Sequence, residues 1–291
     1  MELKPGVITA MITPFKDGKV DFDNLREQVK FQIESGVVGL LPLGTTGETP
    51  ALHDDEQEEI VKVVVEESKD KVAVMVGTGS NSTEKTIMYT KKAEELGADV
   101  ALVVTPYYNK PTDEGLYQHF KAVAESVKIP IIVYNIAGRT GKNIETPVLK
   151  RIAKIPNIVG VKEASGNINQ MGDVINTIPN FMVYSGDDGM TLPLMSLGGI
   201  GIISVVSNLV PKQVVEMVEA AFEGDFESAR EKHFALLPLF KGAFIETNPV
   251  PIKAAMAMKG MILEEYRLPI CKMLDSNKEK LKEILMSMKI L

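Results

Sequence analysis

The sequence predicts an α/β protein, a (β/α)8 TIM barrel with a C-terminal helical extension. Three observations predict this fold. Eight short apolar runs rich in β-branched residues recur between residues 6 and 206. Each run is followed by a longer amphipathic stretch that ends near a glycine or a proline, which is the alternation of strand and helix. Runs such as "VAVMV" and "VALVV" are apolar on both faces, as expected of parallel strands that are covered on both sides.

The strands and helices can be assigned in chain order. The predicted strands span residues 6–15, 38–44, 72–79, 99–106, 130–135, 158–164, 181–187 and 199–206. Asp21 and Gly36 bracket the first helix, and Ser82 and Gly97 bracket the third, in the positions that favour helix starts and ends. A doubly wound open sheet is the alternative, but no G-x-G-x-x-G loop follows the first strand.

The chain changes character after the eighth helix, which is predicted over residues 211–222 and is stopped by Gly224. The remaining residues contain no predicted strand. Helices are expected near residues 225–237, 249–259 and 276–288. We therefore expect a catalytic barrel over residues 1–224 and a helical extension over residues 225–291, packed on the barrel without a linker.

The composition excludes several classes of protein. The 291 residues are 45% hydrophobic and 24% charged, as in a globular protein with a real core. A net charge of −7 without a basic block argues against nucleic-acid binding, and no apolar run approaches the ~20 residues that a membrane span needs. The single cysteine, Cys271, and the absence of a secretory signal predict a cytoplasmic location. The three histidines are isolated, so no zinc site is expected.

In barrels of this kind, the active site lies where the strands end. The second strand ends in "GTTGE", whose hydroxyls and backbone amides suit a small carboxylate, although a plain Gly-Thr turn is the simpler explanation of this segment by itself. Tyr108 follows the fourth strand, Tyr134 ends the fifth, and Arg139 lies in the next loop. These side chains fit packing at the rim as well as proton transfer and carboxylate recognition.

Lys162 is the decisive position, because it continues the apolar sixth strand. Such a lysine either extends to solvent at the strand end or stays neutral in the barrel mouth. Burial can lower a lysine pKa by ~3 to 5 units, and a neutral amine can attack a carbonyl to form a Schiff base. The residue pattern alone leaves both possibilities open, and the polar side chains at neighbouring strand ends favour the catalytic one.

Several segments, taken in order, resemble the pyruvate-dependent class I aldolases, the superfamily of dihydrodipicolinate synthase and N-acetylneuraminate lyase. They are "GTTGE", "VTPYYNKP", "GRTG", "GVKEA", "SGDD" and "FIETNPVPIK", and they span nearly the whole chain. The arginine in "GRTG" favours the synthase branch over the lyase branch. The resemblance implies condensation of pyruvate with L-aspartate 4-semialdehyde on the route to diaminopimelate and lysine. It also implies a homotetramer, built as a dimer of dimers, and no metal or organic cofactor.

The resemblance implies a role for each candidate catalytic residue. Lys162 would form the Schiff base with pyruvate, and Thr45 and Thr46 would meet the pyruvate carboxylate. Tyr134 would act as general acid and base above the imine. Thr45 and Tyr108 would relay its proton, with Tyr108 reaching in from a neighbouring subunit.

The remaining implied site residues surround the entrance and the pocket. Arg139 would bind the carboxylate of the semialdehyde, and the backbone at Gly186 and Ile203 would line the pocket. One departure concerns Ala137, which precedes the glycine of the arginine loop where the resembled proteins usually have proline, so that the loop is expected to be less rigid.

A second departure concerns regulation. In members inhibited by lysine, histidine and glutamate occupy an interface site around the second and third helices. Here Tyr107 and Asn81 match that site, but Asp54, Gln57 and Lys85 stand at its distinctive positions. We therefore expect feedback inhibition by L-lysine to be weak or absent.

Two other functions stay open. One is an aldolase that uses the same pyruvate imine on a 2-keto-3-deoxy sugar acid or on N-acetylneuraminate, against which Arg139 and the "ETNP" segment argue. The other is a catalytically silent barrel that serves as a ligand sensor. The joint presence of Lys162, Tyr134, Thr45 and Tyr108 argues against the sensor.

Overall fold

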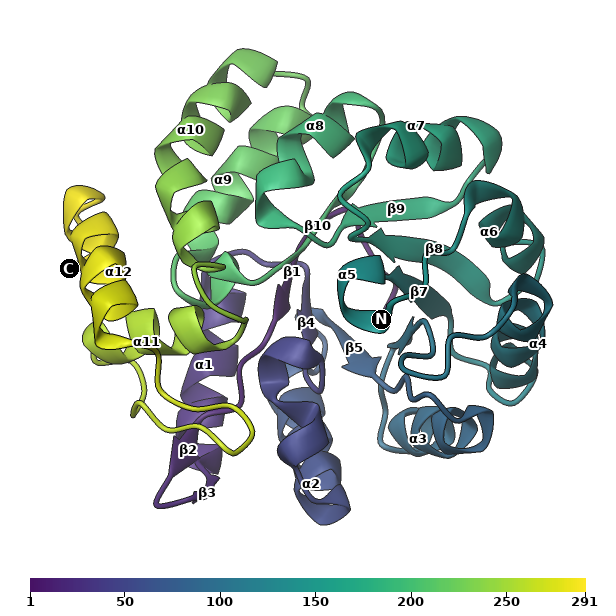
Figure 1. Ribbon diagram of the computed structural model, residues 1–291, viewed down its shortest axis with the longest axis horizontal. Helices are drawn as coiled ribbons and strands as arrows, with labels where there is room; N and C mark the ends of the chain where they lie inside the picture. Colours follow the sequence, from purple (N-terminus) through teal and green to yellow (C-terminus); the bar gives the residue numbers. More distant parts are fainter.

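Eight parallel strands form a closed barrel in the computed structural model, which describes residues 1–291 (Figure 1). They are β1 (Gly6–Ala10), β4 (Gly39–Leu41), β5 (Ala73–Gly77), β6 (Val100–Val104), β7 (Ile131–Asn135), β8 (Ile158–Glu163), β9 (Met182–Ser185) and β10 (Gly201–Ser204). Neighbours in the chain are neighbours in the sheet, and β1 pairs with both β10 and β4 to close it. The predicted barrel and all eight of its strands are confirmed.

Helices surround the barrel, one after each strand (Figure 1). They are α1 (Phe22–Glu34), α2 (Asp54–Ser68), α3 (Thr83–Glu95), α4 (Asp113–Ala124), α6 (Thr146–Ile152), α7 (Ile168–Thr177), α8 (Thr191–Ser196) and α9 (Pro211–Phe222). The predicted end signals act as expected, since the Asp21 and Ser82 side chains accept hydrogen bonds from the first turns of α1 and α3. None of the helices combines the length and the apolar character that crossing a membrane requires.

Two strands end three or more residues earlier than the sequence predicts. β1 stops at Ala10 instead of residue 15, and Phe15 belongs instead to a small separate hairpin of β2 (Phe15–Lys16) and β3 (Lys19–Val20), which turns at Asp17 and Gly18, both at positive φ. β4 stops at Leu41, because the left-handed backbone at Leu43 turns the chain out of the sheet. The strand-like composition of both segments conceals these turns.

Alternate residues of the strands fill the barrel interior. They form one buried cluster that includes Ile8, Met75, Ile132 and Ile203. Tyr184 belongs to the same cluster, and its hydroxyl donates to the backbone oxygen of Lys4 at 2.8 Å. The N-terminal segment therefore covers the end of the barrel from which the strands start, as usual for a packed barrel core.

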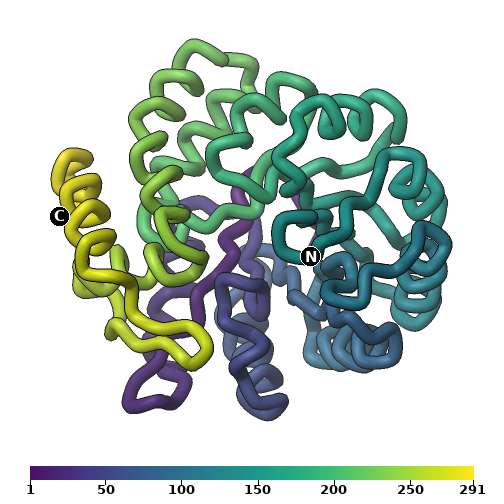
Figure 2. Tube along the Cα trace, viewed as in Figure 1, coloured from purple at the N-terminus to yellow at the C-terminus, as the bar shows by residue number.

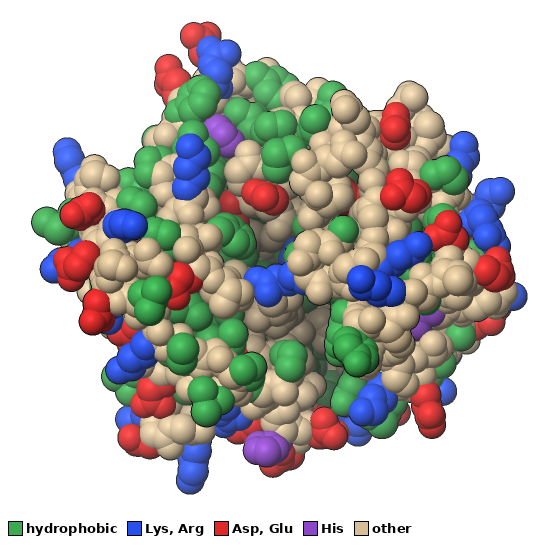
Figure 3. Space-filling model, viewed as in Figure 1, with side chains coloured by type: hydrophobic (Ala, Val, Ile, Leu, Met, Phe, Trp, Pro, Cys, Tyr) green, Lys and Arg blue, Asp and Glu red, His purple; other side chains and the backbone are tan.

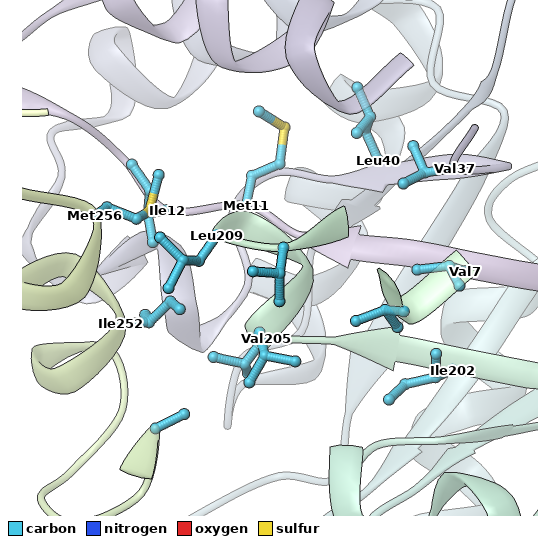
Figure 4. Close-up of a cluster of buried hydrophobic side chains, with 14 of the residues drawn as sticks. Val7, Met11, Ile12, Val37, Leu40, Ile202, Val205, Leu209, Ile252 and Met256 are labelled. Atoms are coloured by element: carbon cyan, nitrogen blue, oxygen red, sulfur yellow. The ribbon is translucent and has the colours of Figure 1, made fainter. Parts of the chain in front are cut away.

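The C-terminal extension packs against the barrel. It consists of α10 (Phe226–Gly242), α11 (Val250–Met258) and α12 (Asp275–Ser287), with α12 outermost (Figure 1). Ile252 and Met256 of α11 enter a cluster of 45 buried residues that also holds Met11 and Ile12 (Figure 4). The segment between α11 and α12 returns alongside the β2–β3 hairpin (Figure 2), where Glu265 accepts hydrogen bonds from the hairpin backbone. Barrel and extension therefore share one core.

Helix α10 continues to Gly242, five residues beyond its predicted end, and the prediction that it stops before Pro238 is wrong. A proline removes one helical hydrogen bond, here to the carbonyl of Phe234. The exposed Phe234 places that turn at the surface, where water can replace the lost donor. The buried Leu239 and Phe240 hold the next turn against the core.

Candidate active site

Lys162 points into the mouth of the barrel from the end of β8. Its register partners are Tyr134 on β7 and Tyr184 on β9, which both belong to the interior cluster. Register partners in a parallel sheet face the same side, so Lys162 faces the interior. The residue is 5% exposed, which excludes a side chain that extends to solvent.

The Lys162 amine is partly neutral at pH 7. Burial lowers its pKa to about 7, the Asp188 carboxylate opposes this shift, and the Arg139 guanidinium adds to it. An amine with such a pKa is a competent nucleophile at neutral pH.

Tyr134 lies directly beside this amine. The Lys162 Nζ is 4.3 Å from the centroid of the Tyr134 ring. Burial raises the pKa of the phenol well above its usual value, and Arg139 only partly offsets this. The tyrosine is therefore protonated at neutral pH and can give a proton to a group bound at Lys162.

The Lys162 side chain passes over Gly186, which follows β9. A Cβ atom there would lie 3.1 Å from both Cγ and Cε of Lys162 and 2.8 Å from Cβ of Ala164. A larger residue would therefore displace the lysine. Ile203 of β10 lies in the interior cluster that also contains Tyr134. Of the two predicted lining positions, Gly186 thus lies beside the lysine, and Ile203 lies in the interior packing around it.

Asp188 is a buried carboxyl group near the lysine, and it is not among the site residues predicted from the sequence. Its oxygens accept hydrogen bonds from the Ser204 hydroxyl at 2.6 Å and from the Val205 backbone at 3.1 Å. Burial raises its pKa to about 6, although these donors favour the charged form. The signal for it was the second acidic residue in "SGDD", directly after a predicted strand.

The Thr45–Thr46 turn lies at the end of β4, where Thr45–Gly47 forms one 3-10 turn. Thr46 is 2% exposed, whereas Thr45 is exposed. Glu48 follows with a left-handed backbone, and its buried carboxylate accepts a hydrogen bond from Lys253 of α11 at 2.6 Å. A buried ion pair from the C-terminal extension thus anchors this turn. The sequence alone does not reveal this ion pair, because Lys253 looks like any polar residue of a helix.

Arg139 lies on α5 (Ala137–Thr140), a short helix after β7 that crosses in front of the strands in Figure 1. Its side chain is exposed, and its Nη2 atom donates to the backbone oxygen of Asn248 at 3.2 Å. The Thr140 hydroxyl lies 2.9 Å from the Ile136 carbonyl oxygen and 3.0 Å from that of Lys142, and its one proton holds the loop closed through either of them. Ala137 therefore begins an ordered helical turn. Figure 3 shows a hollow near the middle of this face, with basic side chains at its margin.

Tyr108 stands apart from these residues. It is 89% exposed, and its backbone is left-handed, with φ 70°. The single chain brings Lys162, Tyr134 and Gly186 together and leaves Tyr108 on the surface. No group of three or more His, Cys, Asp or Glu side chains is arranged to hold a metal ion.

A barrel with a buried, partly neutral lysine at a strand end, beside a protonated phenol, has the site of a Schiff-base-forming lyase. The chain belongs to the dihydrodipicolinate synthetase family, whose model matches residues 4–288. This membership confirms the resemblance found in the sequence.

Individual relatives align along the whole chain. The 4-hydroxy-tetrahydrodipicolinate synthase of Hydrogenobaculum sp. (strain Y04AAS1) is 49% identical over 281 residues, which cover 96% of this chain and 97% of the relative. The crystal structure of dihydrodipicolinate synthase from Thermotoga maritima has a TM-score of 0.98 at 46% identity and covers both chains completely. A dihydrodipicolinate synthase variant described as monomeric has the same TM-score and identity, with 99% of this chain and 98% of that chain covered. These relatives are named as dihydrodipicolinate or 4-hydroxy-tetrahydrodipicolinate synthases, and this is the activity that the sequence predicts.

Proposed function

We propose that the chain condenses pyruvate with L-aspartate 4-semialdehyde through a Schiff base at Lys162, on the route to diaminopimelate and lysine. The observation that carries the proposal is the buried Lys162 amine, with its lowered pKa, 4.3 Å from the ring of the neutral Tyr134. The name of the Hydrogenobaculum relative, 49% identical along the chain, supports the same two substrates.

The first half of the reaction forms the imine. The neutral Lys162 amine adds to the keto carbon of pyruvate. The nitrogen then loses its protons as the former keto oxygen leaves as water. Tyr134 supplies a proton to that oxygen and takes one back when the methyl group of the bound pyruvate is deprotonated to the enamine. Burial raises the pKa of the Tyr134 phenol, so the group is protonated at neutral pH and holds the proton that this step needs first.

The second half uses the enamine carbon as the nucleophile. It attacks the aldehyde carbon, and the aldehyde oxygen takes a proton and becomes a hydroxyl group. The amine of the former semialdehyde then attacks the imine carbon and displaces Lys162, which closes the ring. Two substrates give one cyclic product and one water, and the lysine is regenerated without an oxidant or a reductant.

The two carboxylates are held at different places. The Thr45–Thr46 turn offers hydroxyl groups and backbone amides to pyruvate close to the end of β4. Arg139 stands at the exposed edge, where its remaining N–H groups are free for the carboxylate of the semialdehyde. This separation lets pyruvate bind first and the aldehyde approach from outside.

We further propose that Tyr108 completes the site of a neighbouring subunit in a homotetramer. A tyrosine in the left-handed region costs on the order of 1–3 kcal/mol, and such strain is concentrated at functional positions. The monomeric variant among the structural neighbours indicates that assembly has to be tested for each chain. Mixing Lys162→Met subunits with Tyr108→Phe subunits should restore part of the activity if Tyr108 acts across an interface. Mixtures that stay as inactive as each parent would contradict this role.

Borohydride reduction in the presence of pyruvate tests the imine. Intact mass and peptide mapping should find a reduced pyruvate adduct on Lys162, and Lys162→Met is the matched control without an adduct. A coupled assay with aspartate semialdehyde then identifies the acceptor. No adduct on the folded protein would remove both aldolase functions and favour the ligand sensor. An adduct without semialdehyde turnover would favour the sugar-acid aldolase.

A further inference from the structure

Asn248 touches both parts of the site that receive carboxylates. It lies in the loop between α10 and α11 and is 5% exposed. Its Nδ2 atom donates to the Thr46 hydroxyl oxygen at 2.9 Å, and its backbone oxygen accepts from Arg139 at 3.2 Å. The C-terminal extension thus supplies a contact to a barrel turn that lies 202 residues earlier in the chain.

The direction of the Thr46 contact leaves the hydroxyl proton free. A hydroxyl group has one donor and can accept through its lone pairs, and here the amide of Asn248 occupies an accepting position. The Thr46 hydroxyl donates to no acceptor within the chain, although the residue is almost fully buried. A buried donor without a partner is unfavourable, and a carboxylate oxygen is an acceptor that would satisfy it.

The contacts of the Asn248 side chain reveal no other function for it in the folded chain. Its Oδ1 atom is buried without a hydrogen-bond partner, so the bond to Thr46 is the only one that the side chain makes. Native proteins leave few buried polar atoms unpaired, and each such atom calls for an explanation. An amide placed only to anchor the loop would be expected to pair its oxygen as well.

We propose that Asn248 is a positioning residue that directs the Thr46 hydroxyl proton toward the carboxylate of pyruvate. The inference rests on the proposed function and adds a specificity determinant to it. An amide N–H at this place keeps Thr46 a donor, whereas an acceptor at the same place would take the proton away from the substrate. Whether residue 248 donates a hydrogen bond to Thr46 or accepts one from it therefore matters more than whether the two residues are bonded at all.

Two variants separate these effects. Asn248→Leu removes the amide but leaves the Thr46 proton free, so the pyruvate concentration that half-saturates borohydride trapping at Lys162 should rise no more than about threefold. Asn248→Asp places a carboxylate that accepts the proton, and the same concentration should rise roughly tenfold or more, the scale of one hydrogen bond to a charged group. The KM for pyruvate should follow this order, whereas kcat at saturating pyruvate should change far less.

A third variant, Thr46→Val, shows whether Asn248→Asp weakens pyruvate binding through the Thr46 hydroxyl. Thr46→Val removes the hydroxyl with little change of shape and should by itself raise half-saturation roughly tenfold. In that background, Asn248→Asp should add little, because coupled residues are not additive. An equal rise with and without the Thr46 hydroxyl would mean simple charge repulsion and would overturn the inference, as would normal pyruvate binding by Asn248→Asp.

Asn157→Asp is the matched control, since the Asn157 amide donates to the Ala124 and Val127 carbonyls near the start of β8. Asn157→Asp should leave the pyruvate concentration that half-saturates trapping unchanged. If Asn248→Asp does not fold, the comparison of Thr46→Val with Asn248→Leu decides, and a folded Asn248→Leu variant as impaired as Thr46→Val would refute the proposal. Absence of pyruvate trapping in the wild type would instead refute the proposed function.

Discussion

Replacing Lys162 by methionine should abolish turnover and at the same time raise the free energy of unfolding at pH 7. Burial lowers the pKa of this amine from 10.5 to about 7, so the folded protein binds its proton far less tightly than the unfolded chain does. At about 1.4 kcal/mol per pH unit, this difference is worth roughly 5 kcal/mol as an upper bound. Methionine has a similar length and no charge to desolvate, and its flexible side chain adapts to the packing around it.

The stability that Lys162→Met gains over the wild type should decrease as the pH rises. Between pH 7 and pH 10.5, the unfolded chain carries a proton on Lys162 that the folded chain has lost. The wild type therefore becomes more stable by up to about 1.4 kcal/mol per unit as the pH rises through this range. The variant lacks this contribution. Its advantage should be largest at pH 7 and below and should shrink by up to roughly 3 kcal/mol at pH 9.

Chemical denaturation of both proteins at pH 7, 8 and 9 measures this difference, at one protein concentration so that self-association contributes equally. Lys212→Met on α9 is the matched control, because that side chain is exposed and its replacement should give no pH-dependent difference. A Lys162→Met protein that is less stable than the wild type would refute the reasoning. So would a stability difference that stays constant from pH 7 to pH 9.

Four further predictions concern single groups. Tyr134→Phe should lower kcat by roughly 10²- to 10⁴-fold, because it removes the proton donor; an unchanged kcat in steady-state assays would exclude that role. Arg139→Ala should raise the KM for the semialdehyde more than the KM for pyruvate, and an equal rise would contradict the assignment of separate carboxylate sites. Lys253→Met leaves Glu48 buried without its partner and should cost roughly 3–5 kcal/mol of unfolding free energy, most of which an added Glu48→Gln should restore; denaturant titration of both variants measures this. Micromolar L-lysine should leave the initial rate unchanged, and inhibition in that range would show a working feedback site.

The sequence by itself determined the barrel, its eight strands and the position of Lys162. These features follow from local patterns, because apolar runs of strand length, caps such as Ser82 and stops such as Gly97 act on their immediate neighbours. Lys162 was visible because a charged residue interrupts one of these runs. The resemblance of ordered motifs added the roles of Tyr134 and the other site residues as predictions.

The tertiary structure decided how these parts are held. Asn248 and Lys253 reach the Thr45–Thr46 turn from the far end of the chain, and each looks like an ordinary polar residue of a loop or a helix. The continuation of α10 through Pro238 likewise depends on the core that receives its last turn. The physical reason is the same in each case. Burial and hydrogen-bond partners are set by the packing of elements far apart in the chain, and the free energy of a polar group depends on both.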